Sequence, residues 1–169
     1  MKINLKELWS GLKSSIDFDY TIDLSKEEVN FEFPFQKPVR IFGSISDMAG
    51  VLNLSAEICA QASGHCARCG KAIDYVKNVF ADFVLVQEDD GTADEGDGVF
   101  VVGDQVDLDE ILVAELILNM DMVVLCDENC KGLCYKCGAN LNDEECNCDR
   151  TNKNMPFADL AKLFSENNK

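Results

Sequence analysis

The sequence lacks several features on which common enzyme and membrane classes depend. Its 169 residues include one histidine and three prolines. His65 alone cannot build a convincing nucleophile triad, and no glycine-rich phosphate loop of the Walker or Rossmann type occurs. No uncharged apolar run reaches the roughly 18 residues of a membrane span, and residues 1–14 lack an apolar run of secretory length. We therefore expect a soluble cytoplasmic protein and find no support for an enzyme.

Basic residues are also scarce. Fifteen Lys and Arg face 31 Asp and Glu, which gives a formal net charge of −16 and argues against a chain that coats nucleic acid by neutralising phosphates. The excess is uneven, because ten acidic and no basic residues lie between Gln87 and Glu110. We expect residues 87–106 to form a solvated acidic loop with a short strand at Val99–Val102. Total charge alone therefore does not exclude a face of the protein that contacts RNA.

The apolar residues, 47% of the chain, suffice for a core and follow two periods. Helical spacing predicts a short amphipathic helix over residues 4–12. Two-residue alternation predicts an antiparallel hairpin over 39–61 and a long strand over 73–86. The run Phe31–Phe35 is at best an edge strand, since Pro34 cannot donate to an inner ladder.

The clearest predicted helix begins after Asp107. The Asp107 side chain can cap its first turn, Glu110 can reach back to complete the cap, and Val106 can pack on Ile111 as a hydrophobic staple. Apolar residues then recur at helical spacing as far as Ile117. We expect this helix to cover one face of the sheet.

These elements predict an α+β fold in which an antiparallel β-sheet is covered by a capped helix, with a small C-terminal Cys-rich zinc module. Residues 1–125 form the predicted body, which includes the first cysteine knuckle and the acidic loop. Residues 126–169 form the predicted zinc module and end in a short helical segment over 157–164, with Pro156 at its first turn.

The strongest signal is the cysteine content. Nine cysteines in a chain that is not exported indicate thiols or metal ligands. Cys134-Tyr-Lys-Cys137-Gly has the spacing of a zinc knuckle, and Cys146 and Cys148 follow an eight-residue loop. We predict that these four residues, the distal quartet, hold a structural zinc ion.

A second knuckle, Cys66-Ala-Arg-Cys69, lies far upstream. We hypothesise a second zinc site, the proximal quartet, made of Cys66, Cys69, Cys126 and Cys130. Spacing cannot settle this pairing, so an exchange of members between the quartets, or His65 in place of one thiolate, stays open. A redox pair at Cys66 and Cys69 is disfavoured, because the following residues read as a strand and not as a helix start. Cys59 has no near partner, and we interpret it as an unliganded thiol.

The motifs together resemble those of a known family over roughly residues 37–165. They are Cys66-Ala-Arg-Cys69, the acidic loop, Val106-Asp107-Leu108 with Glu110, the run from Cys126-Asp-Glu-Asn-Cys130 through Lys-Gly-Leu-Cys134, Cys137-Gly-Ala-Asn-Leu-Asn142, and Cys146-x-Cys148. The pattern resembles the YceD family, the large ribosomal RNA subunit accumulation proteins. This resemblance implies a non-enzymatic factor in ribosome biogenesis that supports accumulation of large-subunit (23S) ribosomal RNA.

The expected partners are ribosomal RNA or ribosome assembly proteins, with no membrane and no small-molecule substrate. Candidate contact residues lie on or near the knuckles: Arg68, Lys71, Lys131, Tyr135, Lys136, Arg150 and Lys153. Tyr135 could stack on a base. The alternative is that the basic residues only offset thiolate charge. A different function, a protein-interaction adaptor that works through the acidic loop, is the second hypothesis, and a thiol oxidoreductase is the third.

Overall fold

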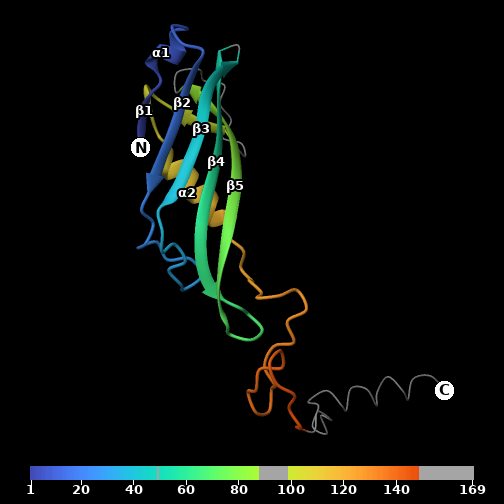
Figure 1. Cartoon of the computed structure of the whole chain (residues 1–169). Coiled ribbons are helices and arrows are strands. Elements are labelled where there is room, and N and C mark those ends of the chain that lie inside the picture. The colour runs from blue at the N-terminus through green and yellow to red at the C-terminus, as the bar shows by residue number, and fades with distance from the viewer. Residues whose placement is uncertain (49, 88–98, 149–169) are drawn as a thin grey trace, which may run out of the picture.

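The structure is mostly antiparallel β-sheet with few helices, which fits the predicted α+β class. It is a computed structural model that describes residues 1–48, 50–87 and 99–148. One sheet has the strand order β2-β3-β4-β5-β6 (Figure 1), and only the β5–β6 pair is parallel. Its strands are β2 (Ser15–Ile22), β3 (Val39–Met48), β4 (Val51–His65), β5 (Ala72–Gln87) and β6 (Val99–Val102).

The predicted hairpin over 39–61 is confirmed as β3 and β4, which pair from Met48–Val51 at the turn to Arg40–Cys59. Every second residue of β4 from Leu52 to Ala62 is buried, as alternation in a sheet with one covered face requires. The predicted strands over 73–86 and Val99–Val102 are confirmed as β5 and β6.

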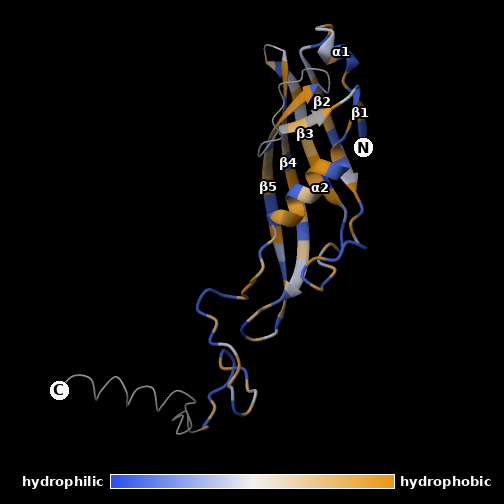
Figure 2. Cartoon of the chain, turned by 180° about the vertical axis from the view of Figure 1, so that it is seen from behind, coloured by the Kyte–Doolittle hydropathy of each residue, from blue (hydrophilic) through white to orange (hydrophobic). Residues whose placement is uncertain are grey.

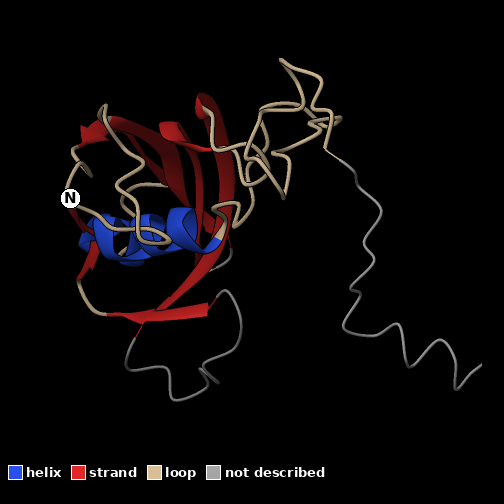
Figure 3. Cartoon of the chain, turned by 90° about the horizontal axis from the view of Figure 1, so that it is seen from below, coloured by secondary structure: helices blue, strands red, loops and turns tan. Residues whose placement is uncertain are grey.

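Helix α2 (Leu108–Leu118) lies in the curve of the sheet (Figure 3). It begins after Asp107, whose side chain accepts a hydrogen bond from the Asp109 backbone N at 3.2 Å. Its buried leucines, Leu108, Leu112 and Leu116, join the apolar sheet residues in one core, and Figure 2 shows apolar residues along both. The Tyr20 hydroxyl donates to Asp109 Oδ1 at 2.8 Å and so ties β2 to α2.

The N-terminal region differs from the prediction. Helix α1 (Lys6–Trp9) is shorter than residues 4–12, and Leu12, expected on its apolar face, is exposed. It follows β1 (Lys2–Asn4), which pairs with β7 (Gln105–Asp107) in a small separate sheet. Neither β1 nor β7 was predicted.

Strand β2 was also missed, although Ile16, Phe18, Tyr20 and Ile22 alternate with polar residues. The predicted edge strand at Phe31–Phe35 is wrong. Asn30 and Phe31 have φ of 53° and 66°, and Val29 and Glu32 exchange backbone hydrogen bonds across them, so the chain makes a tight turn there. Pro34 precedes Phe35, which is buried in the core.

This turn gives a testable prediction. Phe31 is 94% exposed, so its side chain gains little from packing while its left-handed backbone is strained. We expect Phe31→Gly to raise the free energy of unfolding by about 1 kcal/mol, because glycine adopts positive φ without a Cβ clash. Urea unfolding measures it. Phe31→Ala removes the same ring but keeps the strain, so an equal gain in both variants would contradict the explanation.

No helix in the described ranges is long and apolar enough to cross a lipid bilayer. Most of the predicted acidic loop (residues 88–98) and the predicted helical segment over 157–164 lie outside the described residues.

Candidate metal centre

The structure brings eight of the nine cysteines together in two groups of four. They are the predicted proximal quartet, Cys66, Cys69, Cys126 and Cys130, and the predicted distal quartet, Cys134, Cys137, Cys146 and Cys148. Within each quartet all sulfur atoms lie within 4.8 Å of one another, as the ligands of a single ion must. Cys59 lies apart on β4, with its Sγ 3.8 Å from Glu57 Oε1. Each quartet could hold one metal ion.

The two knuckles share one local structure. In the proximal knuckle the Cys66 N donates to Lys71 O at 2.9 Å, and the Gly70 N donates to Cys66 O at 2.8 Å. In the distal knuckle the Cys134 N donates to the carbonyl five residues on, at 2.8 Å, and Gly138 N donates to Cys134 O at 2.8 Å. Both glycines have φ near +70°, 71° and 75°, which glycine adopts without strain.

The second half of the proximal quartet is held by hydrogen bonds that the knuckle donates to its backbone carbonyl groups. The Ala67 N donates to Val124 O at 2.9 Å. Arg68 Nη1 donates to Glu128 O at 3.1 Å and to Cys130 O at 3.0 Å. The end of the β4–β5 hairpin therefore positions Cys126 and Cys130, although they lie about 60 residues further along the chain.

Sulfur spacing in the proximal quartet suits a tetrahedral ion. Cys66 Sγ lies 3.8 Å from Cys130 Sγ, and Cys69 Sγ lies 3.6 Å from Cys126 Sγ. Zinc–sulfur bonds of about 2.3 Å in a tetrahedron place the sulfurs roughly 3.8 Å apart. Cys66, Cys69 and Cys130 are buried, and Leu125 packs on them. Four sulfur donors in this arrangement fit zinc.

Backbone N–H groups favour the thiolate form at the first cysteine of each knuckle. Hydrogen bonds from the backbone of Cys126, and further ones from Arg68 and Cys69, lower the pKa of Cys66 to about 6. The backbone N–H groups of Cys137 and Lys136 likewise lower the pKa of Cys134 to about 6.

Cys126 and Cys148 show the opposite shift. Hydrogen bonding with Cys130 raises the pKa of Cys126 to about 12, and hydrogen bonding with Cys137 raises the pKa of Cys148 to about 11. Four thiols this close cannot all lose their protons unless a cation neutralises the charge. A cation bound in each quartet could supply that neutralisation.

Sequence reasoning missed one residue of this region, Asn142. Its Nδ2 donates to Cys130 Sγ at 3.3 Å, and its Oδ1 accepts from the Lys131 N at 2.7 Å. The available signal was its place in the run Cys137-Gly-Ala-Asn-Leu-Asn142, which is part of the family motif.

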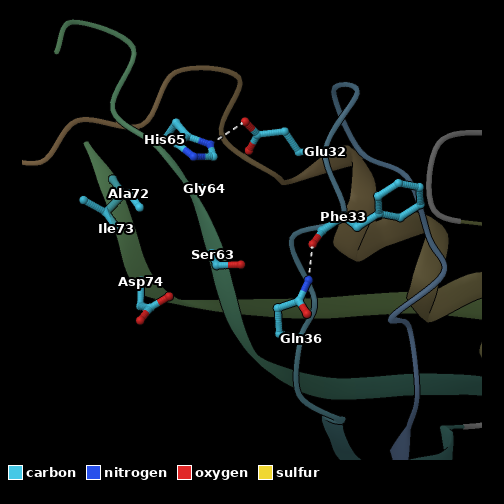
Figure 4. Close-up of a pocket in the computed structure, with 9 residues that line it drawn as sticks. All are labelled: Glu32, Phe33, Gln36, Ser63, Gly64, His65, Ala72, Ile73 and Asp74. Atoms are coloured by element: carbon cyan, nitrogen blue, oxygen red, sulfur yellow. Dashed lines mark hydrogen bonds and ion pairs between the residues drawn. The ribbon is translucent and has the colours of Figure 1, made fainter. Parts of the chain in front are cut away.

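His65 does not join the proximal quartet. Its Nδ1 lies 2.9 Å from Glu32 Oε1, and both side chains line a cavity of about 470 Å³ (Figure 4). This pair links the turn after Asn30 to the end of β4. The alternative in which His65 replaces a thiolate is therefore not the arrangement in the structure.

The predicted contact residues fall into three groups. Lys71, Lys131 and Lys136 are exposed, and Tyr135 is 64% exposed. Arg68 is engaged with the two carbonyl groups described above. Arg150 and Lys153 lie outside the described residues.

Comparison with known proteins identifies related sequences. A family model described as "Large ribosomal RNA subunit accumulation protein YceD" matches residues 54–164. "Large ribosomal RNA subunit accumulation protein YCED homolog 1, chloroplastic" of Arabidopsis thaliana is 36% identical over 59 residues. That match covers 35% of this chain and 18% of the relative, less than a fifth of the relative's length. No solved structure matches the chain.

Proposed function

The chain belongs to the YceD family, the large ribosomal RNA subunit accumulation proteins, and from this we propose that it is a non-enzymatic factor in ribosome biogenesis that supports accumulation of large-subunit (23S) ribosomal RNA. The observation that carries the proposal is that all eight quartet cysteines fall inside the matched residues 54–164. Its site of action is the cytoplasm, whereas the Arabidopsis relative is named chloroplastic. Its partners are ribosomal RNA or ribosome assembly proteins.

We propose that each quartet holds a structural zinc ion. When bound, zinc supplies a cross-link between chain segments. Four cysteine ligands complete a tetrahedral shell and leave no position for a reactive water, which supports a structural and not a catalytic role. Redox chemistry at Cys66 is less well supported, because Cys66 follows strand β4 and does not lie at a helix N-terminus.

Depletion of the protein from its own cells tests the main proposal. We expect the amount of large-subunit ribosomal RNA to fall relative to small-subunit ribosomal RNA, and expression of the intact chain to restore the ratio. An unchanged ratio after depletion would overturn the proposal. Sorting ribosomal particles by size and identifying what co-purifies with the tagged chain would show at which stage it acts.

Direct contact between the chain and RNA can be tested separately with single variants. We expect Lys71→Gln and Lys131→Gln each to weaken binding to large-subunit RNA fragments and to lower the slope of log K against log salt by about one, as loss of a phosphate contact does. Tyr135→Ala should cost roughly 1–3 kcal/mol if the ring stacks on a base. Filter binding at several salt concentrations measures both.

Lys13→Gln is the matched control for these variants. Lys13 pairs with Glu7 of α1. Helix α1 lies at the opposite end of the sheet from the end of the β4–β5 hairpin that carries the proximal knuckle (Figure 1), so replacing Lys13 should leave RNA binding unchanged. If the intact chain does not bind RNA at low salt, it contacts a protein instead.

A second candidate function is that of a protein-interaction adaptor. The run of ten acidic residues without a basic one between Gln87 and Glu110 favours a basic ribosomal protein or an assembly enzyme as partner. Deletion of residues 88–98 should then abolish capture of that partner. If the shortened chain still captures the partner, the segment is only a solubilising spacer.

A further inference from the structure

The distal segment, residues 133–148, is hydrogen-bonded to the proximal knuckle and to the link that follows Cys130. The Leu133 N donates to Arg68 O at 3.2 Å, and the Leu141 N donates to Gly132 O at 2.9 Å. Gly132 has a φ of 72°, and a Cβ there would lie 3.0 Å from Arg68 O. The link between Cys130 and Cys134 therefore runs close against the proximal knuckle.

Asn142 brings a side-chain donor from the distal segment to a proximal sulfur, beside the backbone of Gly132, which also hydrogen-bonds Cys130. Its Nδ2 reaches Cys130 Sγ at 3.3 Å, while its Oδ1 accepts from the backbone next to that cysteine, the Lys131 N, at 2.7 Å. The amide thus engages both the ligand and the backbone that carries it.

The orientation of Asn142 depends on the distal loop. Its own Nδ2 and backbone N donate to Asn140 Oδ1 at 2.8 Å and 3.1 Å, and Asn140 Nδ2 donates to Asp143 Oδ2 at 2.7 Å. This network lies between Cys137 and Cys146, inside the loop that the distal quartet closes. A metal ion that fixes both ends of the loop would restrict Asn142 to the conformation in which it reaches Cys130.

We propose that Asn142 couples the two cysteine quartets, so that an ion bound at the distal quartet strengthens metal binding at the proximal quartet. The inference rests on the proposed metal-binding role of both quartets. Asn142 acts as a positioning residue, because a donor to a ligand sulfur orients that ligand and tunes it for the metal. Losing such an outer contact typically lowers metal affinity by about 10- to 100-fold.

By linkage the coupling is reciprocal, so an ion at the proximal quartet strengthens the distal one by the same factor. The consequence for function is geometric. Loading of both quartets fixes the distal knuckle, with Tyr135, against the end of the sheet that carries Lys71, and so makes one continuous surface of two otherwise separate segments.

Cadmium-113 NMR of the full chain tests the coupling, since each sulfur quartet gives its own resonance when cadmium is the bound ion. Chelator is added, and the concentration that halves each signal is measured. Asn142→Asp keeps the size and the acceptor for the Lys131 N but loses the Nδ2 donor to Cys130 Sγ and to Asn140 Oδ1. In this variant we expect the proximal signal to be lost at about 10- to 100-fold less chelator. Asn129→Ala, an exposed asparagine beside Cys130, should match the intact chain.

A second variant supplies the decisive comparison. Cys146→Ser with Cys148→Ser abolishes the distal signal, and we expect it to weaken the proximal signal to a similar extent, with little further loss on adding Asn142→Asp. An unchanged proximal affinity in this variant would overturn the coupling. The coupling would also be overturned if Asn142→Asp weakened the proximal signal as strongly in the cysteine double variant as it does in the intact chain. Absence of both cadmium signals from the intact chain would instead refute the proposed metal-binding role itself.

Discussion

Replacing Cys130 with serine is expected to remove one of the two proposed metal ions per chain and to release residues 121–148 from the end of the β4–β5 hairpin. Cys130 is 4% exposed and stands opposite Cys66 in the proximal quartet. Structural zinc contributes about 10–16 kcal/mol of apparent binding energy in zinc-finger peptides, as much as the whole stability of a typical domain, about 5–15 kcal/mol. Loss of one ligand should therefore change the structure of the whole segment.

The sheet should survive this change. The proximal cysteines form a small buried cluster of their own, separate from the large core that α2 shares with the strands. Metal analysis should find one ion fewer per chain, and circular dichroism should show that the strand signal is retained. Limited proteolysis should give new cleavage after α2. Strong chelation of the intact chain should give the same cleavage and remove both ions.

Cys59→Ser is the matched control. Cys59 is half-buried on β4 and belongs to neither quartet, so this variant should keep two ions and resist cleavage like the intact chain. Metal loss in Cys59→Ser, or unchanged proteolysis in Cys130→Ser, would show that the quartets do not hold this segment in place.

Gly43→Ala is expected to destabilise the sheet by about 3 kcal/mol, the upper part of the usual range for overpacking. Gly43 lies in β3 between its partners Phe18 on β2 and Ala56 on β4. An added Cβ would lie 2.2 Å from Ser55 O and 2.7 Å from the Ala56 Cα. Both atoms belong to the backbone, so the strands themselves must separate. Thermal unfolding should show a Tm lower by roughly 10 °C.

Gly103→Ala provides the comparison for this effect. No heavy atom lies within 4 Å of a Cβ built at Gly103, and its φ is not positive, so its stability should change by less than about 0.5 kcal/mol. Equal Tm values for the two alanine variants would mean that β3 and β4 adjust without cost at Gly43.

Prediction from the sequence succeeded where the signal was local and regular. The β3–β4 hairpin, strand β5 and the start of α2 after Asp107 all follow from short-range periodicity and turn chemistry. Strand β2 carried an equally regular alternation that was overlooked. The run Phe31–Phe35 failed because the backbone turns at Asn30 and Phe31, residues that carry no strong turn signal such as glycine at the second position.

The sequence by itself determined the two knuckles, because each is built from hydrogen bonds within six residues and a glycine at positive φ. Only the tertiary structure decided which cysteines complete the proximal quartet. Cys69 and Cys126 are separated by the whole of β5, the acidic segment and α2, and the direction of α2 across the sheet brings them together. It also decided that Asn142 reaches Cys130, since a contact between two loops depends on how both are held. Residue spacing fixes the reach of a short segment, whereas the approach of distant segments is set by the packing of the elements between them.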